Sequence, residues 1–539
     1  MVFGDDFLYL IYIFNHKPME RIRNLKRIEE RDQVWDIAVI GGGASGLGVA
    51  LDALSRGLTV ALFEGVDFAK GTSSRSTKLV HGGVRYLAQG DILLVWEALR
   101  ERGRLLRNAP HLTNVQPFVI PIYSYLGKLR YTVGLKIYDW MSGWLSLGDS
   151  YYISKEETIK RLPRIKQEGL LGGVVYHDGA FDDARLALSI ARTCTDLGGC
   201  MLNYTKVNGL LKAEDGKVCG LRVRDVLGKK NYKVKAKMVV NATGVFADKI
   251  LKLDQADSPK MIQPSQGIHL VLPLGFLGGK DALMIPRTSD GRVLFAIPWH
   301  GKLVVGTTDT IREKAKLEPE ALSSEINFIL NTASLYLTKK PTKKDVLAVF
   351  AGLRPLAAPK EGSVRTKEIS RNHKIIVSPS GLVTLTGGKW TTYRKMGEDT
   401  VNWFPKLAGV EIEPSTSWNI KIHGGGDVIL NGHWRSYGTD AIHILELIKS
   451  HPPYAKLLHP EYPYTVGEVV WAVRNEMAMK LDDILSRRLR MLILDPMAAL
   501  EMAPKVAEVM AAELGEKQDW IEGELAGFRK IAKKYIIKT

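Results

Sequence analysis

Cysteine is scarce in this sequence: there are three among 539 residues, Cys194, Cys200 and Cys219. They form neither a CxxC motif nor the paired spacing of a zinc site, and their odd number argues against a disulfide framework. We therefore expect a reducing compartment, no disulfides and no structural metal.

Long apolar runs are also missing. No run approaches the roughly 18 consecutive apolar residues that a membrane-spanning helix requires. The best candidate, residues 7–14 (FLYLIYIF), is too short, and it lacks the basic start and small-residue cleavage site of a signal peptide. Residues 17–31 follow as a basic amphipathic leader in which Met19 is an alternative start. We interpret residues 1–34 as an N-terminal extension that is frayed rather than anchored in a bilayer.

Acidic residues are outnumbered, with 58 Asp and Glu against 75 Lys and Arg, and the formal net charge is +17 at pH 7. This excess favours an anionic partner, such as a nucleic acid, an anionic bilayer or a phosphorylated substrate, although a basic solvated surface explains it equally well. With 45% hydrophobic residues the chain is not largely disordered, and its length predicts two or three domains.

Residues 35–64 predict a strand, a glycine-rich turn, a helix and a second strand, in that order. Gly41, Gly43 and Gly46 form the GxGxxG pattern that opens the helix, which permits a tight turn and close approach of a pyrophosphate to the helix N-terminus. Glu64 ends the second strand, where its carboxylate can accept hydrogen bonds from ribose hydroxyls and would repel a 2′-phosphate. The pattern predicts a dinucleotide site that disfavours NADP.

Two further glycine-rich turns and one polar segment favour FAD over NAD. Residues 71–87 (GTSSRSTKLVHGGVRYL) are polar and irregular where a nicotinamide enzyme would continue with regular strand–helix units. NATG at 241–244 and GGKWTTYRK at 387–395 each follow a strand. Several separate segments that all contact one cofactor suit a long ligand, so we predict an FAD-dependent oxidoreductase.

The remaining pattern is coarser. Residues 181–197 predict a helix capped by an Asp, residues 262–310 an antiparallel sheet, and residues 113–180 an irregular segment. From residue 425 onward the chain is predicted to be almost wholly helical, including residues 466–485 and 497–514.

These residues resemble the FAD-dependent, respiratory glycerol-3-phosphate dehydrogenase family over residues 35–530. The resemblance is carried by DIAVIGGGASG (36–46), residues 71–87, DDARL (182–186), NATG, IPWHGKLVVGTTDT (297–310), GLRPL (352–356), GGKWTTYRK and residues 464–495. It implies an α/β fold, α+β overall: a glutathione-reductase-like Rossmann domain for FAD, an antiparallel-sheet substrate domain and an α-helical C-terminal domain. The domains expected are residues 1–34, an oxidoreductase core at 35–424 and helices at 425–539. Within the core, FAD segments lie near 35–90, 181–250 and 380–400, and substrate segments near 91–180 and 260–375.

The reaction implied is oxidation of sn-glycerol 3-phosphate to dihydroxyacetone phosphate, with hydride passing to FAD and electrons to membrane quinone. Histidine suits the role of general base, and His81 and His269 are both candidates, unranked. Arg85 and Arg354 offer forked donors for phosphate, Tyr86 a hydroxyl, and Lys389 a charge near the flavin. For each of these side chains an ordinary structural role is the alternative.

The expected FAD contacts come from the glycine turn, Glu64, the hydroxyl-rich segment and the two later glycine-rich turns. They are Gly41, Gly43, Ala44, Ser45, Gly46, Glu64, Thr72, Ser73, Ser74, Ser76, Thr77, Lys78, Ala242, Thr243, Gly244, Gly388, Lys389 and Thr391. In the C-terminal part, Arg487, Arg488 and Arg490 are expected to face solvent in preference to acidic lipid.

Three alternatives compete with this assignment. An oxygen-using glycerol-phosphate oxidase would carry a large insertion that is missing here, and an amino-acid-oxidase-like flavoenzyme would need one arginine for a carboxylate rather than several cations. A flavin-containing RNA-binding protein would interleave basic and aromatic residues in a patch, whereas these cations are dispersed. The partners expected are glycerol 3-phosphate, a quinone and the anionic inner face of the cell membrane, bound peripherally from the cytoplasm, without nucleic acid; a homodimer is left open.

Overall fold

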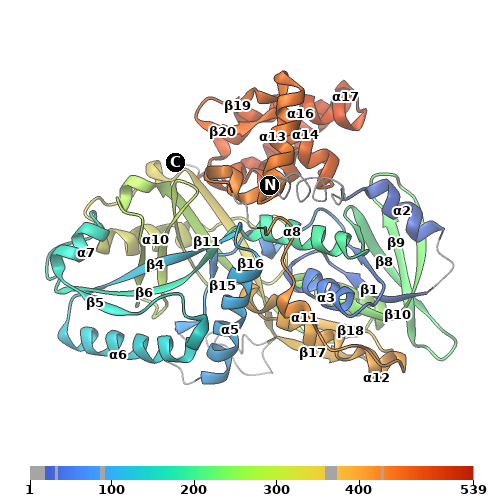
Figure 1. Ribbon diagram of the computed structural model, residues 1–539, viewed down its shortest axis with the longest axis horizontal. Coiled ribbons are helices and arrows are strands. Elements are labelled where there is room, and N and C mark those ends of the chain that lie inside the picture. Colours follow the sequence, from blue (N-terminus) through green and yellow to red (C-terminus); the bar gives the residue numbers. More distant parts are fainter. Residues whose placement is uncertain (1–17, 31–33, 85–90, 359–372, 427–429, 538–539) are drawn as a thin grey trace, which may run out of the picture.

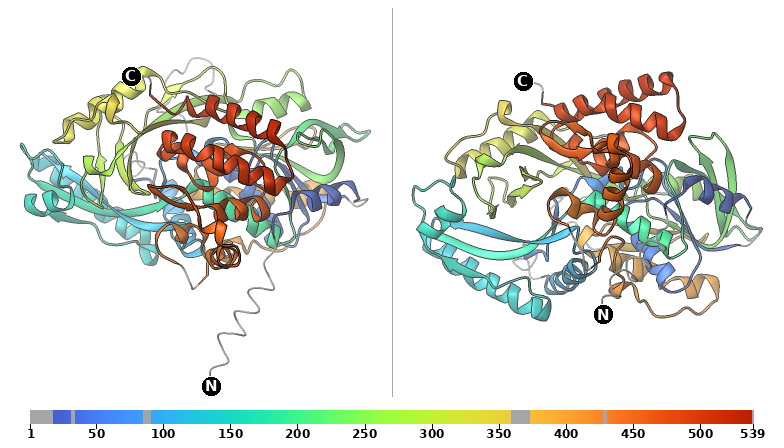
Figure 2. Two further views of the ribbon diagram at one scale, coloured as in Figure 1. Left: turned by 90° about the horizontal axis from the view of Figure 1, so that it is seen from above. Right: turned by 45° about the horizontal axis from the view of Figure 1, so that its top comes forward.

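The computed structural model describes residues 18–30, 34–84, 91–358, 373–426 and 430–537. Two sheets lie side by side, and a group of helices from the C-terminal part covers both from above (Figures 1 and 2). A large cavity lies between the two sheets.

The first sheet has the strand order β17-β18-β10-β1-β2-β7. Its strands are β17 Lys374–Val377, β18 Val383–Thr386, β10 Asn231–Asn241, β1 Trp35–Ile40, β2 Val60–Phe63 and β7 Cys200–Leu202. Along this order all neighbours are parallel except β17, which runs antiparallel to β18. Two more strands complete the sheet: β9 Val218–Asp225 pairs antiparallel with β10, and β8 Thr205–Lys212 pairs antiparallel with β9. Strands buried on both faces read as continuous apolar runs, which explains the pattern of residues 35–64.

Helices cover one face of this sheet. Ile37 and Val39 of β1 share a core with α3 Ala44–Ser55, α8 Asp183–Asp196 and α11 Tyr393–Val401. Ala38 and Ile40 point to the opposite face, toward β8 Thr205–Lys212, β9 Val218–Asp225 and α9 Ala247–Asp254. Because successive side chains of β1 point to opposite faces of the sheet, the strand contributes to two separate hydrophobic cores. Asp182 caps α8 by accepting hydrogen bonds from the amides of Ala184 and Arg185, as predicted.

The N-terminal helix α2 (Arg21–Glu29) packs on the same sheet. Arg21 forms an ion pair with Asp225 of β9, and the Asn24 side chain donates to the Met201 carbonyl at 2.9 Å. The expectation of a frayed extension is therefore wrong for residues 18–30, because Asn24 and Ile28 are buried.

The second sheet has the order β15-β11-β14-β13-β12-β4-β6-β3, with β16 paired to β11 and β5 to β6. Its strands are β3 Leu79–Val80, β4 Thr113–Ile122, β5 Tyr151–Ile153, β6 Gly172–Phe181, β11 Ile262–Pro273, β12 Ala282–Ile285, β13 Leu294–Trp299, β14 Lys302–Gly306, β15 Thr310–Ile311 and β16 Ala348–Ala357. The antiparallel arrangement predicted for residues 262–310 is confirmed.

Residues 113–180 are ordered, contrary to the expectation of an irregular segment. They contain β4, α6 Tyr125–Ser142, β5, α7 Lys155–Arg161 and β6. Pro117 and Pro121 weaken the strand signal of β4, yet the sheet accommodates them, because β12 pairs with β4 only at Phe118 and Val119. The helix α5 Ile92–Asn108 precedes β4, and α10 Ser323–Tyr336 follows β15.

The C-terminal part is built from α13 Asp440–Ser450, α14 Val466–Asn475, α15 Met491–Leu494, α16 Pro496–Leu514 and α17 Gln518–Ala532, with a short hairpin of β19 Leu457–His459 and β20 Tyr462–Thr465. The helix predicted over residues 466–485 ends at Asn475, and a π-helical segment, η11 Asp483–Arg488, follows. The break coincides with Met477, whose φ of +51° a continuous helix excludes. Val469 and Val470 of α14 are buried in the core of the C-terminal part.

Candidate active site

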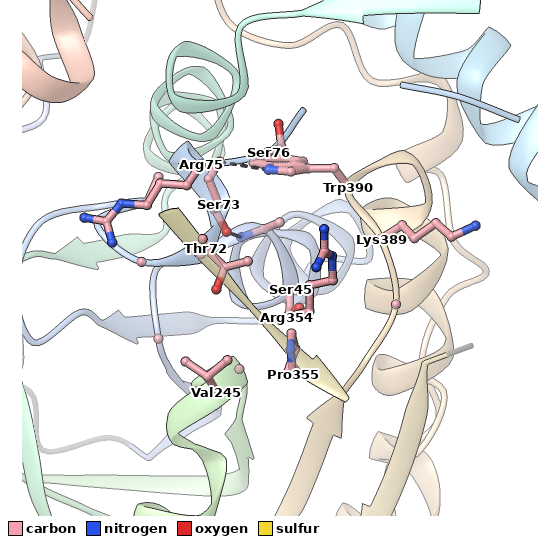
Figure 3. Close-up of a pocket in the computed structure, with 18 of the residues that line it drawn as sticks. Ser45, Thr72, Ser73, Arg75, Ser76, Val245, Arg354, Pro355, Lys389 and Trp390 are labelled. Atoms are coloured by element: carbon pink, nitrogen blue, oxygen red, sulfur yellow. Dashed lines mark hydrogen bonds between the residues drawn. The ribbon is translucent and has the colours of Figure 1, made fainter. Parts of the chain in front are cut away.

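A cavity of about 1150 Å³ lies between the two sheets (Figure 3). Its walls come from the glycine turn after β1, the 71–77 segment, the 242–246 turn, β11, β16 and the 387–391 turn. Because parallel strands end at one edge of their sheet, the turns that follow β1, β10 and β18 meet there. The volume lies just above the range of small-ligand pockets, which suits a dinucleotide together with a substrate.

The glycine turn is shaped by close backbone contacts. Gly41 has a φ of +109°, and a Cβ on Gly46 would lie 1.9 Å from the Gly41 carbonyl oxygen. Gly46 does not line the cavity; it allows α3 to pack tightly on the turn, the third of the glycine roles in this motif. The amide of Ala44, at the start of α3, donates to the Ser73 hydroxyl at 2.9 Å, so the helix N-terminus and the 71–77 segment are joined.

Glu64 lies at the end of β2 and lines the cavity, as predicted. Its two carboxylate oxygens accept from the amides of Gly42 at 2.7 Å and Val66 at 3.0 Å. Burial raises its pKa, although the two amide donors oppose the shift. The bonds fix the carboxylate toward the turn that the dinucleotide would occupy.

The hydroxyl-rich segment divides into residues that line the cavity and residues that do not. Thr72, Ser73, Ser76 and Thr77 line it. The prediction that Ser74 and Lys78 contact FAD is not supported by the geometry, because neither lines the cavity. Lys78 is fully buried, and its Nζ donates to Asp183 at 2.7 Å and to the Ser74 carbonyl at 2.8 Å. The positive φ of Lys78 (+65°) turns the chain at this point.

His269 lies on β11 and is almost completely buried at the cavity wall. Its ring stacks on Phe350 with centroids 4.9 Å apart, and its Nε2 is 3.0 Å from the Thr77 hydroxyl. Burial and the nearby charges of Lys78 and Arg354 hold its pKa well below the ordinary value. The imidazole is therefore neutral at pH 7, the state that a general base requires.

Arg354 lies on β16, opposite Ser265 of the neighbouring strand β11. Its guanidinium donates to the Thr308 carbonyl at 3.1 Å and to the Thr307 hydroxyl at 3.2 Å, and lies 3.4 Å from the Asp309 carboxylate. These contacts orient the planar fork in the wall of the cavity (Figure 3).

His81 and the 387–391 turn meet at another wall. His81, Gly388, Lys389 and Thr391 all line the cavity, and the Thr391 hydroxyl donates to the His81 carbonyl at 3.3 Å. The cavity thus brings both candidate histidines, Arg354 and Lys389 together, whereas Arg85 and Tyr86 lie outside the described residues.

The other predicted cofactor residues are at the same cavity. Ala44, Ser45, Ala242, Thr243 and Gly244 line it along with Gly41 and Gly43. The Thr243 hydroxyl donates to the Asn241 side chain at 2.7 Å, which closes the NATG turn. A Cβ on Gly43 would lie 2.9 Å from the Ser73 hydroxyl, so this cradle needs glycine. The residues present therefore fit a dinucleotide with a pyrophosphate.

Comparison with known proteins places the chain among flavoenzymes. Residues 36–394 match the FAD-dependent oxidoreductase family, and residues 411–520 match the C-terminal domain of alpha-glycerophosphate oxidase. The chain is 39% identical to mitochondrial glycerol-3-phosphate dehydrogenase of Bos taurus, over 96% of this chain and 75% of that protein. It is 37% identical to a probable glycerol-3-phosphate dehydrogenase of Encephalitozoon cuniculi, over 96% and 88% of the two chains.

Solved structures agree. Glycerol-3-phosphate dehydrogenase from Bacillus halodurans, complexed with FAD, superposes with a TM-score of 0.77 at 29% identity and covers 96% of this chain and 98% of its own. The chain belongs to the FAD-dependent glycerol-3-phosphate dehydrogenase family. It is therefore an FAD-dependent oxidoreductase, and the predicted fold class and cofactor are confirmed. An oxidase from Mycoplasma pneumoniae, at 20% identity and a TM-score of 0.55, shares the fold alone.

A buried carboxylate that sequence reasoning missed lies next to His81 in this flavoenzyme. Asp178 of β6 lines the cavity and accepts from the Gly82 amide at 3.1 Å, from the Arg102 guanidinium at 2.7 Å and from the Tyr138 hydroxyl at 3.1 Å. Burial raises its pKa, and the charge of Arg102 opposes that shift. No local motif marks Asp178, because its partners come from α5 and α6.

Arg487, Arg488 and Arg490 are buried, which corrects the expectation that they face solvent or lipid. Arg487 pairs with Asp67 at 2.6 Å, Asp482 at 3.0 Å and Asp483 at 2.6 Å. The spacing of these three arginines resembles that of a basic surface helix. Arg487 nevertheless pairs with Asp67 and Arg490 with Asp183, and both carboxylates are more than 300 residues away in the sequence.

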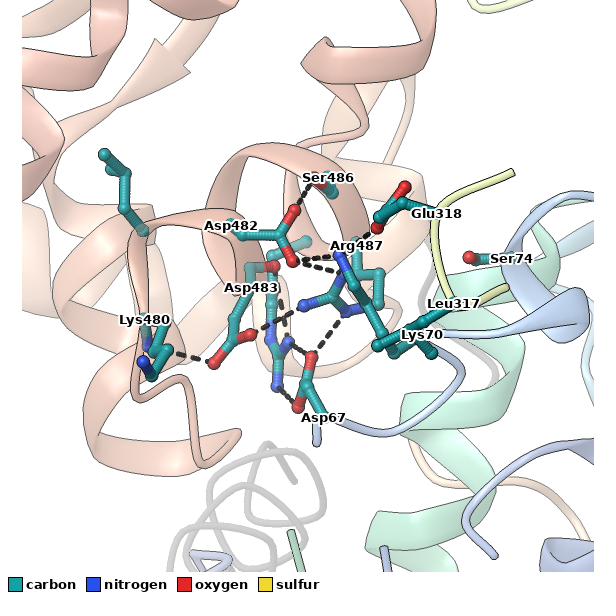
Figure 4. Close-up of polar contacts among 12 residues, drawn as sticks. Asp67, Lys70, Ser74, Leu317, Glu318, Lys480, Asp482, Asp483, Ser486 and Arg487 are labelled. Atoms are coloured by element: carbon teal, nitrogen blue, oxygen red, sulfur yellow. Dashed lines mark hydrogen bonds and ion pairs between the residues drawn. The ribbon is translucent and has the colours of Figure 1, made fainter. Parts of the chain in front are cut away.

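The same ionic network reaches the cofactor pocket (Figure 4). Lys70, which lines the cavity, forms ion pairs with Asp482 at 2.6 Å and Glu318 at 2.5 Å. Arg75, also at the cavity wall, pairs with Glu318 at 2.6 Å. The C-terminal helices are therefore joined by charge to the segment that lies along the cofactor.

Proposed function

We propose that this flavoenzyme oxidises sn-glycerol 3-phosphate to dihydroxyacetone phosphate and passes the electrons to a membrane quinone. The observation that carries the proposal is the meeting, in one cavity, of a neutral buried imidazole (His269) and a fixed guanidinium (Arg354) from adjacent strands. Oxidising a phosphorylated secondary alcohol needs a base for the hydroxyl proton and a cation for the phosphate. Family membership supports the same substrate.

FAD, when bound, supplies the acceptor for the hydride. Arg354, whose guanidinium is held in the cavity wall, binds the substrate phosphate. His269 takes the hydroxyl proton; its ring is held by the stack on Phe350 and by the Thr77 contact. We favour His269 over His81 because it lies on β11, the strand that pairs with the strand of Arg354. Lys389, which lines the same cavity, stabilises negative charge there.

Anaerobic reduction of the purified holoenzyme tests the substrate. Glycerol 3-phosphate should bleach the flavin absorbance, whereas glycerol and amino acids should not. Bleaching by an amino acid would instead support an amino-acid-oxidase-like activity.

Arg354→Gln tests the phosphate contact. Loss of a hydrogen bond to a charged group costs about 1.5–3 kcal/mol, so kcat/KM for glycerol 3-phosphate should fall about 10- to 150-fold. Arg161→Gln is a matched control, because Arg161 pairs with Glu157 and Asp281 away from the cavity. Equal kinetics for the two variants would remove Arg354 from the phosphate site.

The electron acceptor and the cellular site are further parts of the proposal. We propose that the enzyme binds peripherally at the inner face of the cell membrane. Several relatives are named as mitochondrial enzymes. Within the described residues no helix is both long enough and apolar enough to cross a bilayer. Reoxidation of the reduced enzyme by a short-chain quinone much faster than by oxygen would support the quinone, and the reverse would favour an oxidase.

A further inference from the structure

One hydroxyl group stands between the cavity and the imidazole of His269. The His269 side chain is only 2% exposed, and its Nδ1 is enclosed and has no hydrogen-bond partner among the described residues. Its Nε2 lies 3.0 Å from the hydroxyl of Thr77, a half-buried residue that lines the cavity. Protons therefore enter and leave this ring through Nε2, and the Thr77 hydroxyl is the group next to Nε2 at the cavity wall.

The imidazole is held in this orientation by its neighbours. It stacks on the Phe350 ring, with the centroids 4.9 Å apart and the planes at 17°. On the neighbouring strand β14, Gly306 lies opposite His269, and a Cβ at Gly306 would be 2.3 Å from the His269 Cδ2. These close contacts leave the ring little freedom to turn Nδ1 toward the cavity.

The chain on either side of Thr77 is tied to one buried carboxylate. Asp183, at the start of α8, accepts from the Ser76 amide at 2.9 Å, from the Ser76 hydroxyl at 2.7 Å and from Lys78 Nζ at 2.7 Å. Its other oxygen accepts from Arg490 at 2.6 Å. Asp183 and Lys78 are fully buried. The position of the Thr77 hydroxyl is therefore set before a substrate binds, as proton transfer requires.

The Thr77 hydroxyl also has the hydrogen-bonding capacity for a relay. A threonine hydroxyl can donate one proton and can accept at two lone pairs. When it donates to His269 Nε2, both lone pairs are left for other donors, and it has no further hydrogen-bond partner among the described residues. An alcohol in the cavity can donate to it while its phosphate is bound by Arg354, since Arg354 lies on β16, which pairs with the strand of His269.

We propose that Thr77 is a catalytic residue that relays the substrate proton to His269, an inference that rests on the proposed function. The substrate O–H bond breaks as its proton passes to the Thr77 oxygen, while the Thr77 proton passes to His269 Nε2. The electron pair of the O–H bond forms the new carbonyl as the neighbouring C–H bond gives up its hydride, which FAD accepts when bound. Thr77 ends unchanged, and one proton is left on His269.

Anaerobic stopped-flow reduction of the full-length holoenzyme by glycerol 3-phosphate compares Thr77→Val, which keeps the shape, with Thr77→Ser, which keeps the hydroxyl. Because a positioned proton-transfer group contributes about 10²–10⁴-fold, the rate at saturating substrate should fall about 100-fold in Thr77→Val and less than about threefold in Thr77→Ser. Thr332→Val is the matched control. The Thr332 hydroxyl is buried on α10, donates to the Phe328 carbonyl at 2.8 Å and lies outside the cavity, so this variant should be reduced at the unaltered rate.

Two further readouts separate a relay from a structural contact. In mixtures of light and heavy water, two protons in transfer make the rate of the unaltered enzyme fall along a curve as the deuterium fraction rises, whereas Thr77→Val should give a straight line. The flavin content of Thr77→Val should be unchanged. Its Kd for dihydroxyacetone phosphate, measured from the flavin spectrum, should rise by no more than about tenfold, the cost of one neutral hydrogen bond.

Three results would overturn the relay and leave the proposed function standing. They are a Thr77→Val enzyme reduced as fast as Thr77→Ser, a straight line for the unaltered enzyme, and a Thr77→Val protein without bound flavin, which would make Thr77 an FAD contact. An unaltered holoenzyme that glycerol 3-phosphate does not bleach would instead refute the proposed function, and the relay with it.

Discussion

Substituting Asp67 by Asn tests how firmly the C-terminal helices are held to the flavin domain. Asp67 is fully buried and accepts from Arg487 Nε at 2.6 Å, from Arg488 Nη2 at 3.2 Å and from the Asn203 side chain at 3.1 Å. Asn keeps the shape but removes the charge, so two buried guanidinium groups lose a shared partner. Removing one partner of a buried ion pair costs about 3–5 kcal/mol of the free energy of unfolding.

The surrounding charges place the expected loss at the low end of that range. Burial and repulsion from Asp67 raise the pKa of Asp483 to about 6, so the substitution makes ionisation of Asp483 easier. Asp483 and Asp482 remain as partners of Arg487. We therefore expect a loss of about 3 kcal/mol.

Thermal unfolding of the holoenzyme measures this loss. With an unfolding entropy of about 2.1 cal/mol/K per residue, about 3 kcal/mol lowers the Tm by about 3 °C if the whole chain unfolds as one unit. If the roughly 115 residues from 425 onward unfold first, the same loss lowers their transition by about 12 °C. The size of the shift thus also reports whether the two parts unfold together.

The dependence on pH gives a second check. Burial opposes ionisation of Asp67, but the charges of Arg488 and Arg487 outweigh it and hold its pKa below the ordinary value. The stability that this carboxylate contributes is therefore present above about pH 4 and is lost as the pH falls through its lowered pKa. The difference in Tm between the two proteins should shrink in acid.

Glu157→Gln serves as the control, because its ion pair with Arg161 is partly exposed and contributes at most about 1 kcal/mol. A Tm for Asp67→Asn no lower than that of Glu157→Gln would refute the reasoning, since it would mean that the buried network does not hold the two parts together.

Three further predictions concern the site. His269→Asn should abolish the acid limb in the pH profile of the flavin-reduction rate. In the unaltered enzyme this limb lies below pH 6.5, because the pKa of His269 is lowered. His81→Asn should keep the limb, and stopped-flow measurements of flavin reduction across pH decide between the two histidines. Gly46→Ala should yield protein without FAD absorbance, because the new Cβ meets a carbonyl oxygen at 1.9 Å, whereas Gly71→Ala, with open space around it, should stay yellow. Asp178→Asn should slow flavin reduction about tenfold at an unchanged KM, since it loosens the Gly82 amide beside His81; a change in KM alone would contradict this positioning role.

The sequence alone predicted the dinucleotide-binding turn, and most of the residues that it named as FAD contacts line the cavity. Gly41, Gly43 and Gly46 are separated by a few residues, and the backbone geometry of one strand–turn–helix fixes their roles. The residues of the 71–77 segment are likewise close to the turn in sequence. Local spacing therefore carried enough information to predict FAD, and the comparisons confirmed it.

Only the tertiary structure decided what the buried charges do. Arg487 and Lys78 are cations that sequence reasoning assigned to solvent and to FAD, and each instead pairs with a carboxylate distant in the sequence. The exposure of apolar side chains on α6, such as Leu126 and Trp140, could not be predicted either, because an amphipathic helix has the same residue spacing whether its apolar side faces the core or the outside. Burial and ion pairing depend on which elements pack together, and that information is not local.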